Sequence, residues 1–506
     1  MTPLRIGIDV GGTNTDAVVI GPTGALLARA KTPTTADPVD GIAAALSAVV
    51  GADGDRVAMV ALGTTHALNA ILRRRGLGRV GVLRLAGPAT RSVPPFAGWP
   101  EDLRAVVDGG GWVVRGGVEI DGRVHPLDRG EVRDALARCA GVDGIAIAGP
   151  FSLHDPVQEL EAEALVHEVL GDAMPVSLGH RVGGMGLLER ENAAILNASL
   201  GGIVGSVIDA FAAALAAHGI GGTPYLTQND GTLLSVDEAR ALPVLTIGGG
   251  ASNSIRGAGL LTGLADALVV DVGGTSTDVG ALAQGFPRES AFGVEIGGVQ
   301  TNFRMPDVLS VALGGGTIVG ADGRLGPDSV GFRLSERARV FGGDVLTLSD
   351  CAVAAGRAAM GDPALLGSGA WPEALATADA MVADAVDRMK LARGDVPVVL
   401  VGGGSALLPD AVRGASRVLR PPDFDVANAI GAAVGLISGD AEHVLALDAD
   451  RAGGIAAVRA DAAARAQRAG ADPARLETIR VDESALAYTD PPMSRIRVKV
   501  AGPPAA

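Results

Sequence analysis

The sequence predicts an α/β protein made of two consecutive series of strands and helices, each opened by the same short hairpin. The stretch "IDVGGTNTDAVV" begins at Ile8, and the nearly identical stretch "VDVGGTSTDVGA" begins at Val270. Apolar runs of strand length alternate with helical segments after each stretch. A chain of 506 residues is too long for one ordinary hydrophobic core, so we expect two or more domains.

The first series is expected to begin with a β-hairpin. Residues 4–10 form an apolar run, and "DAVVIGPTGALLARAKT" continues it as strand, glycine-rich turn and strand. "DPVDGIAAALSAVVGA" has helical spacing, and "RVAMVALGTTHALNAILRRRG" indicates strand, loop and helix. Two buried strands and the helix "DPVQELEAEALVHEVLG" follow. We place this first domain at residues 1–180.

The second series begins at "ADALVVDVGGTSTDVGAL". It continues through the helical stretch "TADAMVADAVDRMKL" to the strand in "VPVVLVGGGSALLPD" and the helix in "NAIGAAVGLISG". We assign residues 181–445 to this second domain. The remaining residues, 446–506, contain an Ala/Arg helix and two terminal strands that we expect to pack on the core.

Charge and cysteine content narrow the classes of partner and compartment. The net charge is −15 and no basic stripe is present, which argues against a nucleic-acid partner. Cys139 and Cys351 are too far apart in sequence for a disulfide framework or a metal cluster. The start "MTPLRIGIDV" lacks the charged and apolar regions of a signal peptide. We therefore expect a cytoplasmic protein.

The stretch from Ala193 to Ala217 is long and nearly uncharged. Asn197, Asp209 and several Gly and Ser residues interrupt it, and no basic flank follows. We interpret it as buried helix in an Ala-rich core, with a membrane span as the alternative.

An Asp at the end of a strand, followed by Gly-Gly-Thr, suits phosphate binding. Paired glycines permit a tight turn whose N–H groups can converge on an anion. The Thr hydroxyl adds a donor, and the Asp carboxylate can hold Mg²⁺ directly or through water. One such turn is equally well explained as an ordinary hairpin, but the repetition of Asp and Thr favours two turns that grip a polyphosphate.

The other common nucleotide-binding motifs are missing from the sequence. Its three lysines, Lys31, Lys390 and Lys499, follow no P-loop glycine pattern, and no strand leads convincingly into Gly-x-Gly-x-x-Gly. A third glycine-rich element, "VVLVGGGSALLPD", joins a strand to a turn at Gly402, where a flat ring could approach the backbone.

With these three elements the chain resembles the actin-like ATPase superfamily, and within it the hydantoinase/oxoprolinase family of the hydantoinase A type. The resemblance extends over nearly the whole chain, in "GIDVGGTNTDAVV", "GTTHALNAILRRRG", "RENAAILNASL", "NSIRGAGLLTGLADALVVDVGGTSTDVGAL", "GGVQTNFRMPDVLSVALGGGT", "GRLGPDSVG" and "ANAIGAA". It implies two actin-like, ribonuclease H-like lobes, each a mixed sheet with helices, with an ATP cleft between them.

The resemblance also implies which residues contact the nucleotide. Asp9 and Asp271 would handle Mg²⁺ and, with Thr13 and Thr275, form the catalytic set. The residues assigned to ATP binding are Gly11, Gly12, Thr13, Thr15, Gly273, Gly274, Thr275, Thr277, Gly402, Gly403, Gly404 and Ser405. Asp16 and Asp278 are interpreted as hairpin caps.

Weaker assignments concern the substrate. "GTTHALNA" resembles the family's substrate loop through Thr64, Thr65 and Asn69, whereas His66 stands where many members have an apolar residue, and a structural role for it stays open. Glu189 and Arg304 are further candidates; surface ion pairing is the alternative for Glu189. Further site candidates, with less support from the motifs, are Arg190, Glu191, Asp307 and the turn Gly314–Thr317.

The implied activity is ATP-dependent opening of a cyclic amide such as a hydantoin, oxoproline or lactam, after phosphorylation of its carbonyl oxygen. A subunit of an ATP-dependent ketone carboxylase, a small-molecule kinase and a regulatory ATPase acting on a partner protein are the alternatives. An iron–sulfur activator is disfavoured because it would need clustered cysteines.

Two departures from the family's pattern bear on these expectations. "TIGGGASNSIRGA" stands where many members have Ser-Gly-Pro, and familiar members are longer at the C-terminus. A missing module is then expected on a second subunit of the hydantoinase B type, which would make this chain the ATP-using half. A homo-oligomer is also an open alternative.

Overall fold

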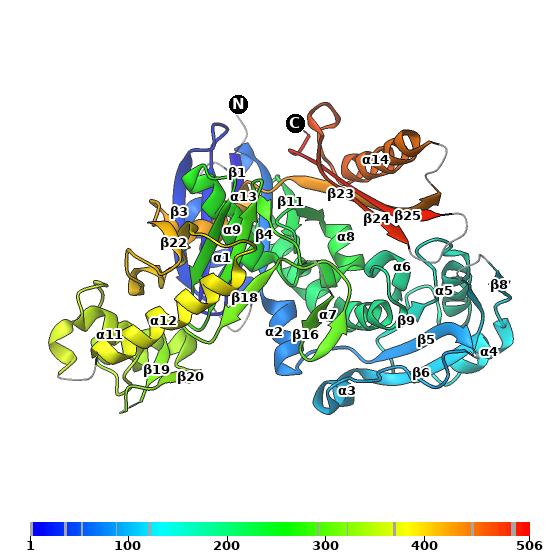
Figure 1. Cartoon of the computed structure of the whole chain (residues 1–506), viewed down its shortest axis with the longest axis horizontal. Coiled ribbons are helices and arrows are strands. Elements are labelled where there is room, and N and C mark those ends of the chain that lie inside the picture. The colour runs from blue at the N-terminus through cyan, green and yellow to red at the C-terminus, as the bar shows by residue number, and fades with distance from the viewer. Residues whose placement is uncertain are drawn as a thin grey trace.

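The computed structural model describes residues 4–34, 38–51, 54–87, 89–119, 123–290, 293–320, 322–367, 371–446, 450–486 and 492–505. Figure 1 shows the first hairpin beside the central helices, with one arm of the molecule at the lower left and another at the lower right. The C-terminal strands and their helix lie at the upper right.

The first sheet begins with an antiparallel meander. Its strands are β1 (Leu4–Val10), β2 (Asn14–Ile20), β3 (Leu26–Pro33), β4 (Val57–Thr64) and β11 (Thr223–Thr227). β1 pairs antiparallel with β2 and parallel with β4, which pairs parallel with β11, so the order is β3-β2-β1-β4-β11. Strands β12 (Leu233–Ser235), β23 (Ile437–Ala446), β25 (Met493–Gly502) and β24 (Glu477–Leu486) extend it to nine strands.

The second sheet repeats this order. Its strands are β13 (Ala267–Val272), β14 (Thr277–Ala283), β15 (Phe286–Pro287), β21 (Val396–Val401) and β22 (Ala415–Leu419), ordered β15-β14-β13-β21-β22, with β18 (Val308–Val311) paired to β14. Asp9 is opposite Asp16 in the first hairpin, as Asp271 is opposite Asp278 in the second. The sequence repeat is therefore a repeat of strand order and register, and the predicted fold of two lobes with mixed sheets is confirmed.

A separate parallel sheet is inserted into the first lobe. Its strands are β5 (Val80–Gly87), β6 (Asp108–Arg115), β9 (Gly144–Ala148) and β10 (Val176–Leu178), flanked by α3 (Glu101–Val107), α4 (Arg129–Leu136) and α5 (Val157–Leu170). The predicted domain boundary at residue 180 is wrong, because β11, β12 and β23 all return to the first sheet. Residues 80–178 are thus an insertion within that lobe.

Two helices cross between the lobes, α9 (Gly249–Thr262) and α13 (Ala427–Ala433). α13 packs on β1 and β2, and α9 packs on β13 and β14. Their backbones touch: a Cβ at Gly257 would lie 1.9 Å from the Ala427 carbonyl oxygen, and one at Gly431 would lie 1.9 Å from that of Asn253. Only glycine fits at this crossing, which fixes α9 between the two hairpins.

The apolar stretch predicted as buried helix is one continuous helix, α7 (Leu187–Ala217). Among the described residues it is the one helix whose length and hydropathy would allow a membrane span. Leu196, Leu200 and Phe211 are nonetheless buried against neighbouring elements. Its packing is that of a core helix.

The other helices and strands are shorter or peripheral. They are α1 (Pro38–Val49), α2 (His66–Arg73), α6 (Gly179–Val182), α8 (Val236–Ala241), α10 (Leu334–Arg337), α11 (Leu348–Ala354), α12 (Trp371–Met389), α14 (Arg451–Arg468), and the strand pairs β7 (Gly117–Val118) with β8 (Val124–His125), β16 (Val294–Ile296) with β17 (Val299–Thr301), and β19 (Thr317–Val319) with β20 (Leu325–Ser329). Among the described residues of the 446–506 region, α14 is followed by the strands β24 and β25, and these strands join the first sheet.

Candidate nucleotide and metal site

The turns of the two hairpins lie against each other. Each is closed by an equivalent hydrogen bond, from Gly11 N to the Asn14 carbonyl at 3.0 Å and from Gly273 N to the Ser276 carbonyl at 2.9 Å. A Cβ at Gly274 would lie 2.8 Å from Thr13 Oγ1. The two candidate phosphate turns therefore form one site at the boundary of the two lobes.

Asp9 is buried at the end of β1 and is held from two sides. Asn253 Nδ2 donates to Asp9 Oδ1 at 3.2 Å, and Asn428 Nδ2 donates to Asp9 Oδ2 at 2.9 Å. A Cβ at Gly63 would lie 2.4 Å from Asp9 Oδ1, so the neighbouring strand must have glycine there. The carboxylate is thus fixed in one orientation.

Asp271 occupies the equivalent position on β13. Ser254 Oγ donates to Asp271 Oδ2 at 2.5 Å. A Cβ at Gly402 would lie 2.1 Å from Asp271 Oδ1, and Gly402 has a φ of 82°, so glycine is required there on two counts. Asn253 and Ser254 are consecutive residues of α9, so one helix holds both aspartates.

Both carboxyl groups have shifted proton affinities. Burial raises the pKa of Asp9 to about 6, helped by the charge of Asp16, while hydrogen bonds from Asn253 and Asn428 limit the increase. Burial raises the pKa of Asp271 to about 7, with the hydrogen bond from Ser254 opposing it and the charge of Asp9 adding to it. Two carboxyl groups poised near neutral pH at one site are typical of functional residues.

The predicted adenosine loop packs on the second hairpin. Gly404 N donates to the Val272 carbonyl at 2.8 Å, and Gly402 N donates to the Phe424 carbonyl at 2.9 Å. Gly403 is exposed, and Ser405 is buried with its hydroxyl lacking a hydrogen-bond partner among the described residues. All three glycine-rich elements are therefore gathered at one place, as a single nucleotide site requires.

The turn at Gly314 also joins this group. Gly315 N donates to the Gly273 carbonyl at 3.0 Å, and Gly316 N donates to the Gly274 carbonyl at 2.7 Å. A Cβ at Gly314 would lie 2.6 Å from Thr275 N. The N–H groups of this turn therefore hold the second hairpin in place by bonding to the carbonyl groups of the hairpin.

Two of the predicted phosphate-binding threonines face inward. Thr277 is fully buried and its hydroxyl donates to the Leu313 carbonyl at 2.6 Å. Thr15 is also fully buried, 3.4 Å from the Thr34 hydroxyl. Exposed Thr275 and partly exposed Thr13 remain available to a ligand. We therefore expect Thr15 and Thr277 to support the turns, and phosphate contact to come from Thr13 and Thr275.

Asp16 and Asp278 bind to neighbouring strands. Lys31 Nζ lies 2.5 Å from Asp16 Oδ1, and Ser310 Oγ donates to Asp278 Oδ1 at 2.5 Å. Each is the register partner of the residue it bonds. They tie the second strand of each hairpin to the next strand, a different role from the predicted capping.

The predicted substrate loop lies beside the first hairpin. β4 runs parallel to β1 with Gly63 opposite Asp9, and Thr65 N donates to the Val10 carbonyl at 3.4 Å. His66 Nδ1 lies 2.7 Å from Thr64 Oγ1, and Asn69 Nδ2 donates to Thr65 Oγ1 at 3.2 Å. Burial lowers the pKa of His66, which keeps its ring neutral at pH 7.

The other two substrate candidates lie in other parts of the structure. Glu189 is exposed in the first turn of α7. Arg304 lies in an ion-pair network with Glu289 and Glu442 near the C-terminal strands. Among the described residues no hydrogen bond or ion pair joins either side chain to a hairpin turn, so both assignments remain predictions.

Asp9 and Asp271 are suitable as the ligands that a protein contributes to a magnesium–nucleotide site. Mg²⁺ prefers oxygen ligands and is usually held by one or two carboxylates together with phosphates and water. Among the described residues, no group of three or more His, Cys, Asp or Glu side chains could hold a metal ion by itself. The two aspartates would then hold a cation that arrives with the nucleotide.

Two protein-family models match this chain, and together they span most of it. One described as the hydantoinase/oxoprolinase N-terminal region matches residues 5–170, and one described as hydantoinase/oxoprolinase matches residues 190–369. The chain belongs to the hydantoinase/oxoprolinase family. Each of the two matched regions of this hydantoinase/oxoprolinase chain contains one of the hairpins, while the adenosine loop lies beyond them.

Two curated relatives of the hydantoinase/oxoprolinase chain are subunits of larger enzymes. The acetophenone carboxylase gamma subunit of Aromatoleum aromaticum is 28% identical over 394 residues, covering 69% of this chain and 53% of its own length. The caprolactamase subunit alpha of Pseudomonas jessenii is 28% identical over 473 residues, covering 85% and 65%. The chain thus spans between about half and two thirds of the length of these relatives.

A solved structure shows the same fold. The crystal structure of ATP-dependent caprolactamase from Pseudomonas jessenii aligns over 98% of this chain and 87% of that chain, with a TM-score of 0.75 and 20% sequence identity. The predicted fold is thereby confirmed.

Proposed function

We propose that this chain is an ATP-dependent enzyme, or the ATP-using subunit of one, that phosphorylates the carbonyl oxygen of a small cyclic amide. The observation that carries this proposal is the pair of aspartates, buried Asp9 and partly buried Asp271, on facing hairpins and held by adjacent residues of α9. The family membership and the ATP-dependent caprolactamase relative support the same class of chemistry.

The reaction that fits has four balanced steps. The amide oxygen attacks the γ-phosphorus of ATP and ADP leaves. Water then adds to the activated carbon, the ring C–N bond breaks and the nitrogen leaves as an amine. A second water attacks the carbonyl carbon of the resulting acyl phosphate, the C–O bond to the phosphoryl group breaks, and carboxylate and phosphate are released. The chain's own part would be to hold phosphates at the two turns and place the substrate near Asp9.

A divalent cation bound with ATP would neutralise charge on the transferred phosphoryl group. Asp9 and Asp271 are the residues that would hold it. A carboxyl group with a pKa of about 6 or 7 can alternatively accept a proton at neutral pH, so a direct acid–base role for either aspartate stays open.

The second candidate function is that of a subunit of an ATP-dependent ketone carboxylase. It is favoured by the acetophenone carboxylase gamma subunit, which at 28% identity is as similar to this chain as the caprolactamase subunit. In that case the oxygen to be phosphorylated belongs to an enol. The same nucleotide site would serve both reactions.

Phosphate release from Mg·ATP distinguishes these proposals. The purified chain is assayed with a panel of lactams, hydantoins, and ketones with bicarbonate, and with the Asp271→Asn variant as control. Release that depends on a cyclic amide and is lost in the variant supports the first proposal, and release that depends on a ketone supports the second. If ATP is neither hydrolysed nor raises the melting temperature, the nucleotide-site assignment is wrong.

A further inference from the structure

A cavity of about 720 Å³ lies between the C-terminal strands and the inserted sheet of the first lobe. Its walls come from the segment after β9, from α6, from the segment after β17, and from β23, α14 and β25. Its lining includes Ser152, His180, Asn229, Arg304, Glu442 and Arg495. No residue of either hairpin turn or of the adenosine loop lines it, so it is separate from the nucleotide site.

One face of the three C-terminal strands carries alternating charges. On β25 every second residue is basic, at Arg495, Arg497 and Lys499, while the residues between them pack on α14. Pairing places Glu442 and Asp482 on either side of Arg497. It places Asp440 and Arg480 on either side of Lys499. We call this set, together with Arg495, the charged face.

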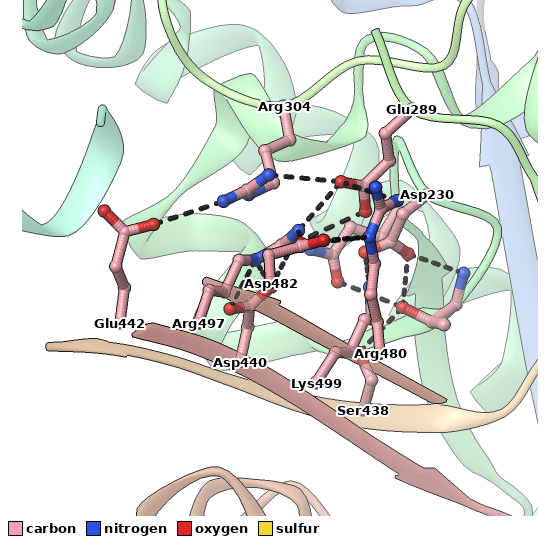
Figure 2. Close-up of polar contacts among 12 residues, drawn as sticks. Asp230, Glu289, Arg304, Ser438, Asp440, Glu442, Arg480, Asp482, Arg497 and Lys499 are labelled. Carbon is pink, nitrogen blue, oxygen red and sulfur yellow. Dashed lines mark hydrogen bonds and ion pairs between the residues drawn. The ribbon is translucent and has the colours of Figure 1, made fainter. Parts of the chain in front are cut away.

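Two of the three basic residues on β25 have carboxylate partners. The Arg497 side chain is 2% exposed, and it pairs with Asp440 and with Glu289, the latter at 2.8 Å. Lys499 is buried and pairs with Asp230. Figure 2 shows Glu289 at the centre of this network, with Arg304, Arg480 and Arg497 directed toward it. These contacts account for the charges in this part of the face.

Arg495 differs from both. Its register neighbours are Val444 and Ser484, so no carboxylate stands beside it. Within the part of the chain that the structure describes, it has no ion pair or side-chain hydrogen bond. It lines the cavity and is partly exposed. A guanidinium group without a counter-charge on a cavity wall is a ready partner for an anion.

A carboxylate oxygen of Glu442, on the neighbouring strand β23, lies diagonally across from Arg495. Glu442 Oε2 accepts from Arg304 Nη2 at 3.2 Å, whereas Glu442 Oε1 is buried with no hydrogen-bond partner among the described residues. In Figure 2 only one oxygen of Glu442 is joined to a neighbour. Because Glu442 is opposite Arg497, it is the diagonal neighbour of Arg495, about 7 Å away. A buried acceptor without a partner favours a ligand that donates there.

The facing wall presents an oriented histidine. His180 Nδ1 lies 2.6 Å from Glu159 Oε2, and Glu159 also accepts from the backbone N–H groups of His180 and Gly149. Burial opposes ionisation of Glu159, but these hydrogen bonds outweigh it and lower its pKa, so it is a carboxylate. The other ring nitrogen of His180, Nε2, is left for a ligand in the cavity.

We propose that this cavity binds a small zwitterion, an ω-amino acid whose ammonium group bonds Glu442 and whose carboxylate pairs with Arg495. Among the described residues, an arginine without a counter-charge and a buried carboxylate oxygen without a hydrogen-bond partner carry this inference, and neither depends on events at the nucleotide site. Opening of a lactam ring yields an ω-amino acid. The further identification of this ligand as the reaction product rests on the proposed function.

Isothermal titration calorimetry of the purified chain without ATP tests the proposal. The probes are 6-aminohexanoate and its singly charged analogues hexanoate and hexylamine. We expect 6-aminohexanoate to bind at least about 10-fold more tightly than either analogue, since each loses one charged hydrogen bond. Equal binding of hexanoate, or no measurable heat with millimolar 6-aminohexanoate, overturns the proposal.

Variants locate the binding site. Arg495→Gln should weaken 6-aminohexanoate binding about 10-fold, and because Arg495 has no internal partner its replacement leaves no group unpaired. Glu442→Gln should have a similar effect, whereas the exposed carboxylate Glu477 serves as control in Glu477→Gln. Unchanged affinity in Arg495→Gln places the ligand elsewhere and refutes the site.

The two proposals fail separately. Zwitterion binding without any lactam-dependent phosphate release leaves this site standing and removes the product assignment together with the proposed function. Lactam-dependent phosphate release with 6-aminohexanoate affinity unchanged in Arg495→Gln leaves the function standing and removes this site.

Discussion

Asn253 and Ser254 are adjacent on α9 and hydrogen-bond two different aspartates, Asn253 to Asp9 on the first hairpin and Ser254 to Asp271 on the second. One helical turn therefore sets the distance and orientation between the two carboxylates. Since the two aspartates belong to different lobes, α9 couples the lobes at the nucleotide site.

Removal of either donor should impair turnover while leaving the fold intact. A buried carboxylate that loses a hydrogen bond costs about 1–3 kcal/mol, so Asn253→Ala and Ser254→Ala should each lower kcat/KM for phosphate release about 10- to 100-fold. Ser206→Ala is the matched control, because the Ser206 hydroxyl donates to the Gly202 carbonyl of its own helix. Wild-type kinetics in both α9 variants would show that the aspartates need no support from α9.

The adenosine loop permits a comparison of adjacent glycines. Gly402→Ala adds a Cβ 2.1 Å from Asp271 Oδ1 at a φ of 82°, whereas a Cβ at Gly403 meets nothing within 4 Å. We expect Gly402→Ala to lower the melting temperature and to reduce affinity for a non-hydrolysable ATP analogue about 10-fold or more. Gly403→Ala should melt like wild type. Equal melting temperatures for the two variants would contradict the packing of this loop on Asp271.

The raised pKa of Asp271 predicts how the stability of the folded chain depends on pH. Its pKa of about 7 in the folded chain exceeds the ordinary 3.8, so the folded state binds more protons between these values and its stability falls as pH rises through that window. Asp271→Asn carries no such charge. Without nucleotide or Mg²⁺, it should melt at least about 2 °C higher than wild type at pH 8, with a smaller gain at pH 5. A gain independent of pH would mean that burial does not shift this carboxyl group.

The role of His66 can be determined by measuring KM and kcat separately in a variant. Its pKa is lowered and its Nδ1 is engaged by Thr64, so we expect a neutral ring that offers Nε2–H to the substrate. His66→Phe keeps a planar ring without nitrogen and should raise KM for the amide about 10-fold while KM for ATP is unchanged. A loss confined to kcat, with a shifted pH profile, would instead indicate proton transfer by His66.

The sequence predicted the hairpins because repetition of Asp-Val-Gly-Gly-Thr is a local signal. Asn253, Ser254 and Asn428 were not predicted as site residues, although the stretches "NSIRGAGLLTGLADALVVDVGGTSTDVGAL" and "ANAIGAA", which carry the family resemblance, contain them. Their roles depend on contacts between residues far apart in the chain, such as Asn253 with Asp9, and no local periodicity reports such contacts. The polar run from Ser252 to Ser254, which begins two residues after three consecutive glycines, was the available signal.

The boundary at residue 180 was misplaced for a related reason. The inserted sheet and α7 separate β4 from β11, yet β11 pairs with β4. Sequence order therefore suggested a new domain where the chain returns to the old one. The alternating basic residues Arg495, Arg497 and Lys499 were visible in the sequence, but their partners on β23 and β24 followed only from the register.

The central claim is that the oxygen of the substrate becomes phosphorylated. The most direct test uses a lactam labelled with ¹⁸O at its carbonyl, turned over with Mg·ATP by this chain, together with its second subunit if one is required. The account predicts that the label passes into the released phosphate, because the acyl phosphate is cleaved at its carbon atom. Phosphate that never carries the label, with all of it retained in the amino-acid carboxylate, would contradict the account.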